Sequence, residues 1–154
     1  MSFSPKQVEG SLDARGLRFG VVCARWNPTV TDGMLESALD TLRRRGARER
    51  DVTIVRVPGA FEVPAGVRVL MESAKPDGLV ALAAIVRGET THHDVLGRAV
   101  AGSLANLAAE TGVPVGFGIL TCETMEQARD RVEKGVEAAE AAIEMANLRR
   151  QLKR

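Results

Sequence analysis

Two adjacent histidines, His92 and His93, are the only histidines in the chain, and they follow directly on the segment Arg87-Gly88-Glu89-Thr90-Thr91. Histidine is the side chain that most readily accepts and returns protons near neutral pH. Gly88 can take a positive φ, and backbone amides and threonine hydroxyls at the start of a helix favour an anion. These residues therefore predict an anion-binding turn beside a group that transfers protons.

A purely structural interpretation fits the same residues about equally well. Thr91 and Asp94 have the Thr-x-x-Asp spacing of a helix capping box, and the histidines would then be surface residues of the first helical turn. A second pair with this spacing, Thr29 and Asp32, predicts a capping box at an earlier helix. The local pattern leaves both interpretations of the histidines open.

An apolar run precedes the turn, and a helical pattern follows it. Residues 78–86 show no polar alternation, which is typical of a strand buried on both faces, and residues 95–109 have helical periodicity. Similar pairs recur along the chain, with the other strands expected at residues 17–24, 51–57 and 113–120. The last helix is expected to run without interruption over residues 125–150, with a bend at most at Gly135.

Strands that alternate with helices favour a parallel sheet with right-handed crossovers. We therefore expect an α/β fold: a three-layer flavodoxin-like domain with a four-stranded parallel sheet in the order 2-1-3-4. Ligands of such sheets bind beyond the carboxyl ends of the strands. Residues 1–16 have no clear periodicity and are expected to form an N-terminal arm, and residues 17–154 a single domain.

Composition excludes several classes of protein. The 154 residues are 45% hydrophobic and 27% charged, and the formal net charge of +1 comes from interspersed acidic and basic residues, so neither a nucleic acid nor a membrane is an expected partner. Cys23 and Cys122 have neither zinc-binding nor Cys-x-x-Cys spacing. No signal peptide is apparent, and we expect a cytoplasmic protein.

Polar and aromatic residues gather where the predicted strands end. Trp26 and Asn27 follow the first strand, residues 59–62 the second, residues 88–93 the third and Thr121 the fourth. The sequence has no dinucleotide fingerprint, no Walker motif and no acidic pair of a phospho-receiver. The remaining set fits a flat heterocycle together with a small phosphorylated partner. Alternatively, Glu62 could do no more than complement the dipole of the helix that follows it.

Six motifs at consistent spacing resemble 6,7-dimethyl-8-ribityllumazine synthase, over roughly residues 17–148. They are Arg25-Trp26-Asn27, Val57-Pro58-Gly59-Ala60-Phe61-Glu62-Val63-Pro64, Arg87-Gly88-Glu89-Thr90-Thr91-His92, Val115-Gly116-Phe117-Gly118-Ile119-Leu120-Thr121, Glu126-Gln127-Ala128 and Glu144-Met145-Ala146-Asn147. The resemblance implies a transferase of riboflavin biosynthesis. It would condense 5-amino-6-(D-ribitylamino)uracil with 3,4-dihydroxy-2-butanone 4-phosphate, releasing phosphate and water, with no cofactor or metal.

The resemblance also implies residue roles, with His92 as the catalytic group that moves protons. Binding of the pyrimidine and its ribityl chain falls to Trp26, Asn27, Ala60, Phe61, Glu62, Ile85, Val86 and Phe117. Phosphate binding falls to Gly88, Glu89, Thr90, Arg131 and Lys134, with Arg129 as an alternative cation. In this family the phenylalanine and the arginine come from the neighbouring subunit, which implies a homo-oligomer with shared sites.

Two positions depart from the family pattern. His93 stands where a phenylalanine or tyrosine is usual, but the Thr-Thr-His register favours His92, and a change at His93 is expected to matter little. The segment Glu133-Lys134-Gly135 replaces a longer loop found in many relatives. We therefore expect a homopentamer, or two loosely associated pentamers, instead of the sixty-subunit shell of some relatives.

Two alternatives to an enzyme are a non-catalytic lumazine or flavin binding module and a purely shell-forming protein.

Overall fold

The computed structural model describes residues 2–153. Met1 and Arg154, the outer ends of the predicted arm and domain, lie outside the described residues. The elements in chain order are β1 (Phe19–Ala24), α1 (Pro28–Arg44), the 3₁₀ helix η1 (Glu49–Asp51), β2 (Val52–Val57), the 3₁₀ helix η2 (Ala60–Glu62), α2 (Val63–Ala74), β3 (Gly78–Val86), α3 (His92–Thr111), β4 (Val115–Cys122), α4 (Met125–Arg129) and α5 (Lys134–Leu152).

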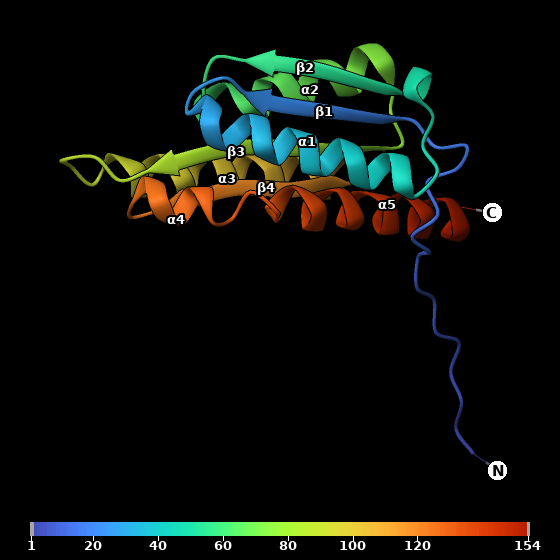
Figure 1. The fold of residues 1–154 in the computed structure, drawn as a ribbon. Coiled ribbons are helices and arrows are strands. Elements are labelled where there is room, and N and C mark those ends of the chain that lie inside the picture. The colour runs from blue at the N-terminus through green and yellow to red at the C-terminus, as the bar shows by residue number, and fades with distance from the viewer. Residues whose placement is uncertain (1, 154) are drawn as a thin grey trace.

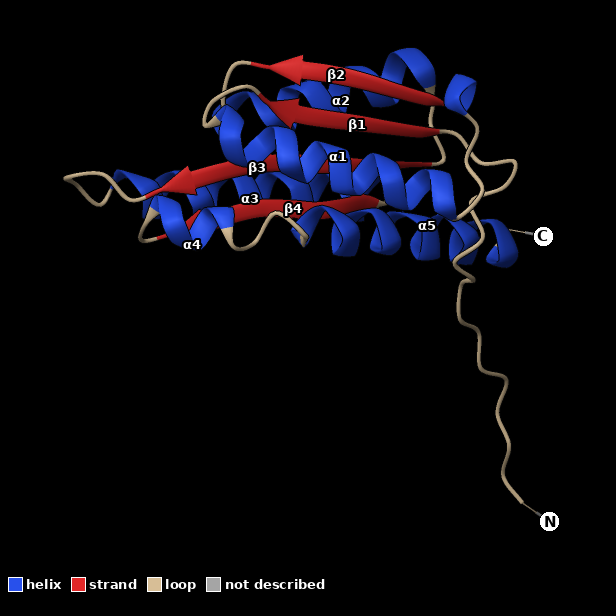
Figure 2. Ribbon diagram, viewed as in Figure 1, coloured by secondary structure: helices blue, strands red, loops and turns tan. Residues whose placement is uncertain are grey.

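The four strands form one parallel sheet in the order β2-β1-β3-β4, which confirms the predicted fold class and strand order. In the register of the sheet, Val22 of β1 lies opposite Val55 of β2 and Ala81 of β3. Figure 2 shows all four strands pointing the same way, so their carboxyl ends share one edge of the sheet. The predicted polar and aromatic residues gather at this edge.

Helices cover both faces of the sheet, as the three-layer prediction requires. Helices α1, α4 and α5 lie on one face, and α2 and α3 lie on the other (Figure 1). The first core contains Met34, Leu42 and Ile143, and the second contains Val63, Val67 and Val100. Strand β3 is buried over its whole length except at Val86, where it enters the polar edge.

The prediction of one helix over residues 125–150 is wrong, because the chain leaves the helix after Arg129 and resumes it at Lys134. Two contacts with α1 explain the break. The Ser37 hydroxyl donates to the carbonyl of Val132 at 2.9 Å, and Gly135 packs so close to α1 that a Cβ there would overlap the carbonyl oxygen of Met34. The apolar phase continues across the break, so periodicity gave no sign of it.

Both predicted Thr-x-x-Asp capping boxes are also absent. Helix α1 begins at Pro28, directly after Asn27, and Asp32 instead pairs with Arg56 at 3.0 Å. Thr91 precedes α3 without a side-chain capping bond. Sequence spacing alone did not reveal that proline and a left-handed asparagine begin α1.

The N-terminal residues leave the body of the protein at the end opposite the strand arrowheads (Figure 1). Residues 2–11 have no helix or strand, whereas Ala14 and Leu17 are buried in the core. The described residues of the predicted arm therefore form an exposed part and a buried part. The predicted pairing of this arm with a neighbouring sheet stays a prediction.

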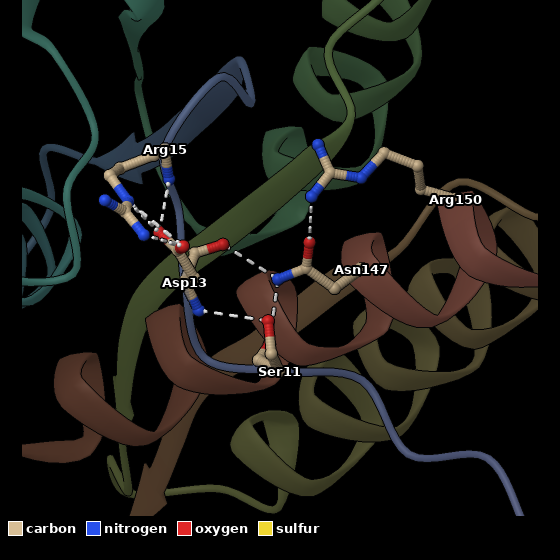
Figure 3. Close-up of polar contacts among 5 residues, drawn as sticks. All are labelled: Ser11, Asp13, Arg15, Asn147 and Arg150. Atoms are coloured by element: carbon tan, nitrogen blue, oxygen red, sulfur yellow. Dashed lines mark hydrogen bonds and ion pairs between the residues drawn. The ribbon is translucent and has the colours of Figure 1, made fainter.

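One buried side chain ties this segment to α5. Asn147 is 1% exposed, and its Nδ2 donates to the carbonyl oxygens of Ser11 and Asp13, each at 2.8 Å. Its Oδ1 accepts from Arg150 Nη2 at 2.7 Å. Figure 3 shows Asn147 between these partners, with Asp13 also bound to Arg15. The amide has partners at both ends, as a buried polar group requires.

Candidate active site

A cavity of about 380 Å³ lies at the carboxyl ends of β1 and β3 and beside η2. It collects residues from the ends of three elements and from the start of α3. Its lining residues are Trp26, Asn27, Gly59, Ala60, Phe61, Glu62, Ala84, Ile85, Val86, Gly88, Thr90, His92, His93 and Leu96. Ten of the fourteen candidate site residues predicted from the sequence line this cavity, namely Trp26, Asn27, Ala60, Phe61, Glu62, Ile85, Val86, Gly88, Thr90 and His92.

Asn27 sets the geometry of the first wall. Its φ of 60° lies in the left-handed region, which asparagine tolerates better than most residues. Its Nδ2 donates to the carbonyl oxygen of Ala84 at 2.8 Å, which ties the end of β1 to β3. The turn leaves the Trp26 ring 72% exposed at the mouth of the cavity. An exposed aromatic face at such a mouth can stack on a planar ligand.

The second wall is the η2 turn after β2. Glu62 Oε1 accepts a hydrogen bond from the backbone amide of Gly59 at 3.1 Å, which closes the turn, and the same carboxylate lines the cavity. Phe61 is 71% exposed, whereas Ala60 is buried against the sheet. Glu62 therefore does stabilise the turn at the start of the following helix, and its carboxylate still lies at the cavity wall.

The third wall is the segment after β3, which projects beyond the sheet in Figure 1. Thr90 Oγ1 accepts from the backbone amide of His92 at 3.2 Å, so the threonine and not a capping box orders the start of α3. The side chain of His92 is exposed, and Gly88 does not have the positive φ that we predicted. Glu89 is exposed and does not line the cavity.

The remaining predicted phosphate ligands lie elsewhere in the chain. Arg131 and Lys134 line a separate, open cavity of about 710 Å³, where Arg131 Nη1 donates to the carbonyl of Gln127 and Lys134 pairs with Glu137. Phe117 lies on β4, is 42% exposed and lines neither cavity. Among the described residues that line the first cavity, none is lysine or arginine.

Comparison with known proteins decides the family. The family model described as 6,7-dimethyl-8-ribityllumazine synthase matches residues 16–150. A protein named 6,7-dimethyl-8-ribityllumazine synthase from Desulfotalea psychrophila is 46% identical over 149 residues, covering 94% of this chain and 96% of the relative. Proteins of the same name from two strains of Nitratidesulfovibrio vulgaris are 43% identical over 152 residues, covering 96% of this chain and 97% of each relative.

The chain belongs to the 6,7-dimethyl-8-ribityllumazine synthase family. The resemblance drawn from six motifs is thereby confirmed, and it extends over nearly the whole length. No helix among residues 2–153 is long and apolar enough to cross a membrane.

Sequence reasoning missed two residues in the wall of this cavity and the burial of a third. Leu96 lies four residues after His92, and residues at this spacing share one face of a helix, so the signal was present. Ala84 lies within the apolar run, where nothing distinguished it from its neighbours. His93 is 7% exposed, whereas the structural interpretation placed both histidines on the surface.

The cysteines of this lumazine synthase family member offer no nucleophile to the cavity. Burial raises the pKa of the Cys23 thiol to about 11, so the group stays protonated at neutral pH. Burial also raises the pKa of Cys122, at the end of β4. Neither cysteine is among the described residues that line the cavity.

Proposed function

We propose that this chain is a lumazine synthase that works at the cavity described above. It condenses 5-amino-6-(D-ribitylamino)uracil with 3,4-dihydroxy-2-butanone 4-phosphate to 6,7-dimethyl-8-ribityllumazine, phosphate and water, a step of riboflavin biosynthesis. The observation that carries the proposal is that an aromatic ring, a carboxylate, a hydroxyl and an imidazole line one cavity in a chain of this family: Trp26, Glu62, Thr90 and His92.

The pyrimidine takes the side of the cavity formed by β1, β3 and η2. Trp26 stacks on the flat ring, and the backbone groups of Ile85 and Val86 bind its polar edge. Asn27 and the segment 60–62 hold the ribityl chain. Support comes from the position of these residues in one wall and from the exposure of Trp26.

His92 carries the proton transfers. An amine attacks a ketone to form an imine and releases a first water, phosphate leaves from the neighbouring carbon, and ring closure of the second amine on the remaining carbonyl releases a second water. Each step moves a proton between neutral partners, which suits one imidazole with good access to both substrates. Orientation of two bound substrates contributes as well, and it can lower a barrier by about 7–11 kcal/mol at best. The exposure of His92 at the cavity wall supports this role.

The phosphate group needs a cation that a single chain does not bring to the cavity. Gly88, Glu89 and Thr90 supply backbone and hydroxyl groups of the turn. Arg131, Lys134 and Phe117 of a neighbouring copy complete the site, with Arg129 as the alternative cation. Support comes from the absence of lysine and arginine among the described lining residues and from the exposed position of Arg131.

The direct test is to mix the purified protein with both substrates and to follow absorbance in the lumazine band. A chelator is included in a parallel reaction. Product formation at the same rate in both reactions supports a lumazine synthase that needs no added metal. Ligand binding without product would instead indicate a binding module on the same fold.

Trp26→Ala is expected to weaken pyrimidine binding by about 0.5–1.5 kcal/mol beyond the loss of contact area, the usual value of an aromatic pair. Trp26 is the only tryptophan in the chain, so its fluorescence reports binding directly. Titration of the unchanged protein should quench this emission. Emission that stays constant at saturating ligand would remove Trp26 from the site.

The proposed assembly is a homopentamer or a loose pair of pentamers. The exposed part of the predicted N-terminal arm of residues 1–16 would add a strand to the neighbouring sheet, whose β2 edge pairs only with β1 among the described strands. The expectation of a continuous last helix no longer supports this assembly, because the helix is broken. The short segment at residues 133–135 still does.

Sedimentation of dilute protein is expected to give the mass of five or ten chains of 16.5 kDa. The physical reason is that a shell needs a second set of contacts between pentamers, and in this family such contacts go with the loop that residues 133–135 replace. A particle of near-megadalton mass would contradict the prediction.

We also infer a cytoplasmic location, supported by two buried cysteines that are present as free thiols.

A further inference from the structure

His93 lines the cavity but has no part in the roles proposed above. It is the second residue of α3, and its imidazole is 7% exposed, whereas that of His92 is exposed. The sequence register predicts that a change at His93 matters little. Deep burial of a polar ring in the first turn of a helix gives a reason to revise that expectation.

The imidazole of His93 faces two carboxylates. Its Nε2 lies 3.3 Å from Asp94 Oδ1 and 3.9 Å from Glu123 Oε1. The other oxygen of Glu123 accepts from Arg87 Nη1 at 2.8 Å. This hydrogen bond is the main reason why the pKa of Glu123 is lowered, and the carboxylate is therefore ionised at neutral pH. Glu123 thus lies between a guanidinium and an imidazole.

These contacts fasten both ends of the turn that carries the candidate phosphate ligands. At its start, the Arg87 amide donates to the carbonyl of Cys122 at 2.8 Å, and the Arg87 side chain binds Glu123. At its end, His93 faces the same Glu123. Segment 88–92, which includes His92, therefore lies between two residues, Arg87 and His93, that both contact the end of β4.

A histidine at this position has a cost that a phenylalanine or tyrosine would avoid. Nδ1 of His93 is buried without a hydrogen-bond partner among the described residues. Leaving a buried polar atom unpaired costs free energy. A phenylalanine ring would fill the same space but could not pair with a carboxylate. The contact with Glu123 is a gain that offsets this cost.

We propose that His93 is a positioning residue that holds segment 88–92 against the end of β4 through Glu123. It thereby sets the place of the phosphate-binding turn and of His92. The proposal rests on the proposed function and deepens it, since it names the phosphorylated ketone as the substrate whose binding depends on His93.

Two replacements break the contact from opposite sides. His93→Phe fills the space without a charge, and Glu123→Gln changes an exposed residue whose replacement does not disturb the core. Each is expected to raise the KM for the phosphorylated ketone by about two- to fivefold, the usual value of an ion pair with an exposed partner, and to leave the KM for the pyrimidine unchanged. The double variant should be no worse than the poorer single variant. His93→Gln, which keeps a donor, should recover part of the loss.

The matched control is Glu110→Gln, which removes an exposed carboxylate at the far end of the same helix. It should behave like the unchanged protein in both KM values. Thermal unfolding of all variants shows whether they are folded. A rise in both KM values together, or fully additive effects in the double variant, would overturn the proposal.

Failure of this inference can be told apart from failure of the proposed function. If the unchanged protein forms no lumazine, the proposed function is wrong. If it forms lumazine, and His93→Phe equals it in both KM values, the role of His93 alone is wrong.

Discussion

His92→Ala is expected to slow lumazine formation by roughly tenfold to a thousandfold, while the pyrimidine still binds. General acid-base catalysis is typically worth about 10² to 10⁴ in rate, and the lower part of that range applies because the uncatalysed condensation is itself feasible. The imidazole of His92 is exposed at the cavity wall, so its removal leaves no buried hole. Single-turnover absorbance measures the chemical step, and Trp26 fluorescence measures binding.

Free imidazole provides the control for this variant. Because the position of His92 is open to solvent, added imidazole should restore part of the lost rate in His92→Ala and should not accelerate the unchanged protein. His92→Ala with an unchanged rate would remove this residue from the chemistry.

Gly116→Ala is expected to lower the free energy of unfolding by about 1–3 kcal/mol, the usual cost of overpacking, or by more. Gly116 lies on β4, and a Cβ at this position would overlap the carbonyl oxygen of Ala138 in α5. The obstacle is backbone, so α5 has to shift as a whole. Urea unfolding followed by circular dichroism measures the change.

Gly102→Ala is the matched control. Gly102 lies in α3, and a Cβ there would meet no atom within 4 Å. Alanine in a helix interior is favoured over glycine by roughly 0.5–1 kcal/mol, so this variant should be slightly more stable than the unchanged protein. Equal effects of the two replacements would show that β4 and α5 do not meet as closely as described.

The sheet was the part of the fold that sequence predicted best. Residues 78–86 form a strand with the predicted bounds because an apolar run of that length has few other buried solutions. The break after Arg129 could not be predicted, since it depends on a hydrogen bond between Ser37 and Val132, which are 95 residues apart. Periodicity describes which face is apolar, but it does not describe where another helix contacts the backbone.

The candidate site shows the same division. Trp26, Glu62 and His92 could be placed together because parallel strands end at one edge. The burial of His93 could not be predicted, because it depends on where Glu123 and Asp94 lie after folding. Spacing also favoured a capping box at Thr91, whereas the Thr90 hydroxyl takes the local amide.

The Asn147 amide has a consequence for the order of events during synthesis. Its bonds to Ser11 and Asp13 join residues separated by 136 and 134 positions. Ser11 and Asp13 therefore stay without this anchor until α5 has been made. A nascent chain that still lacks α5 cannot hold its N-terminal segment in the direction seen in the finished protein. Anchoring of that segment therefore comes after the synthesis of Asn147, and not before it.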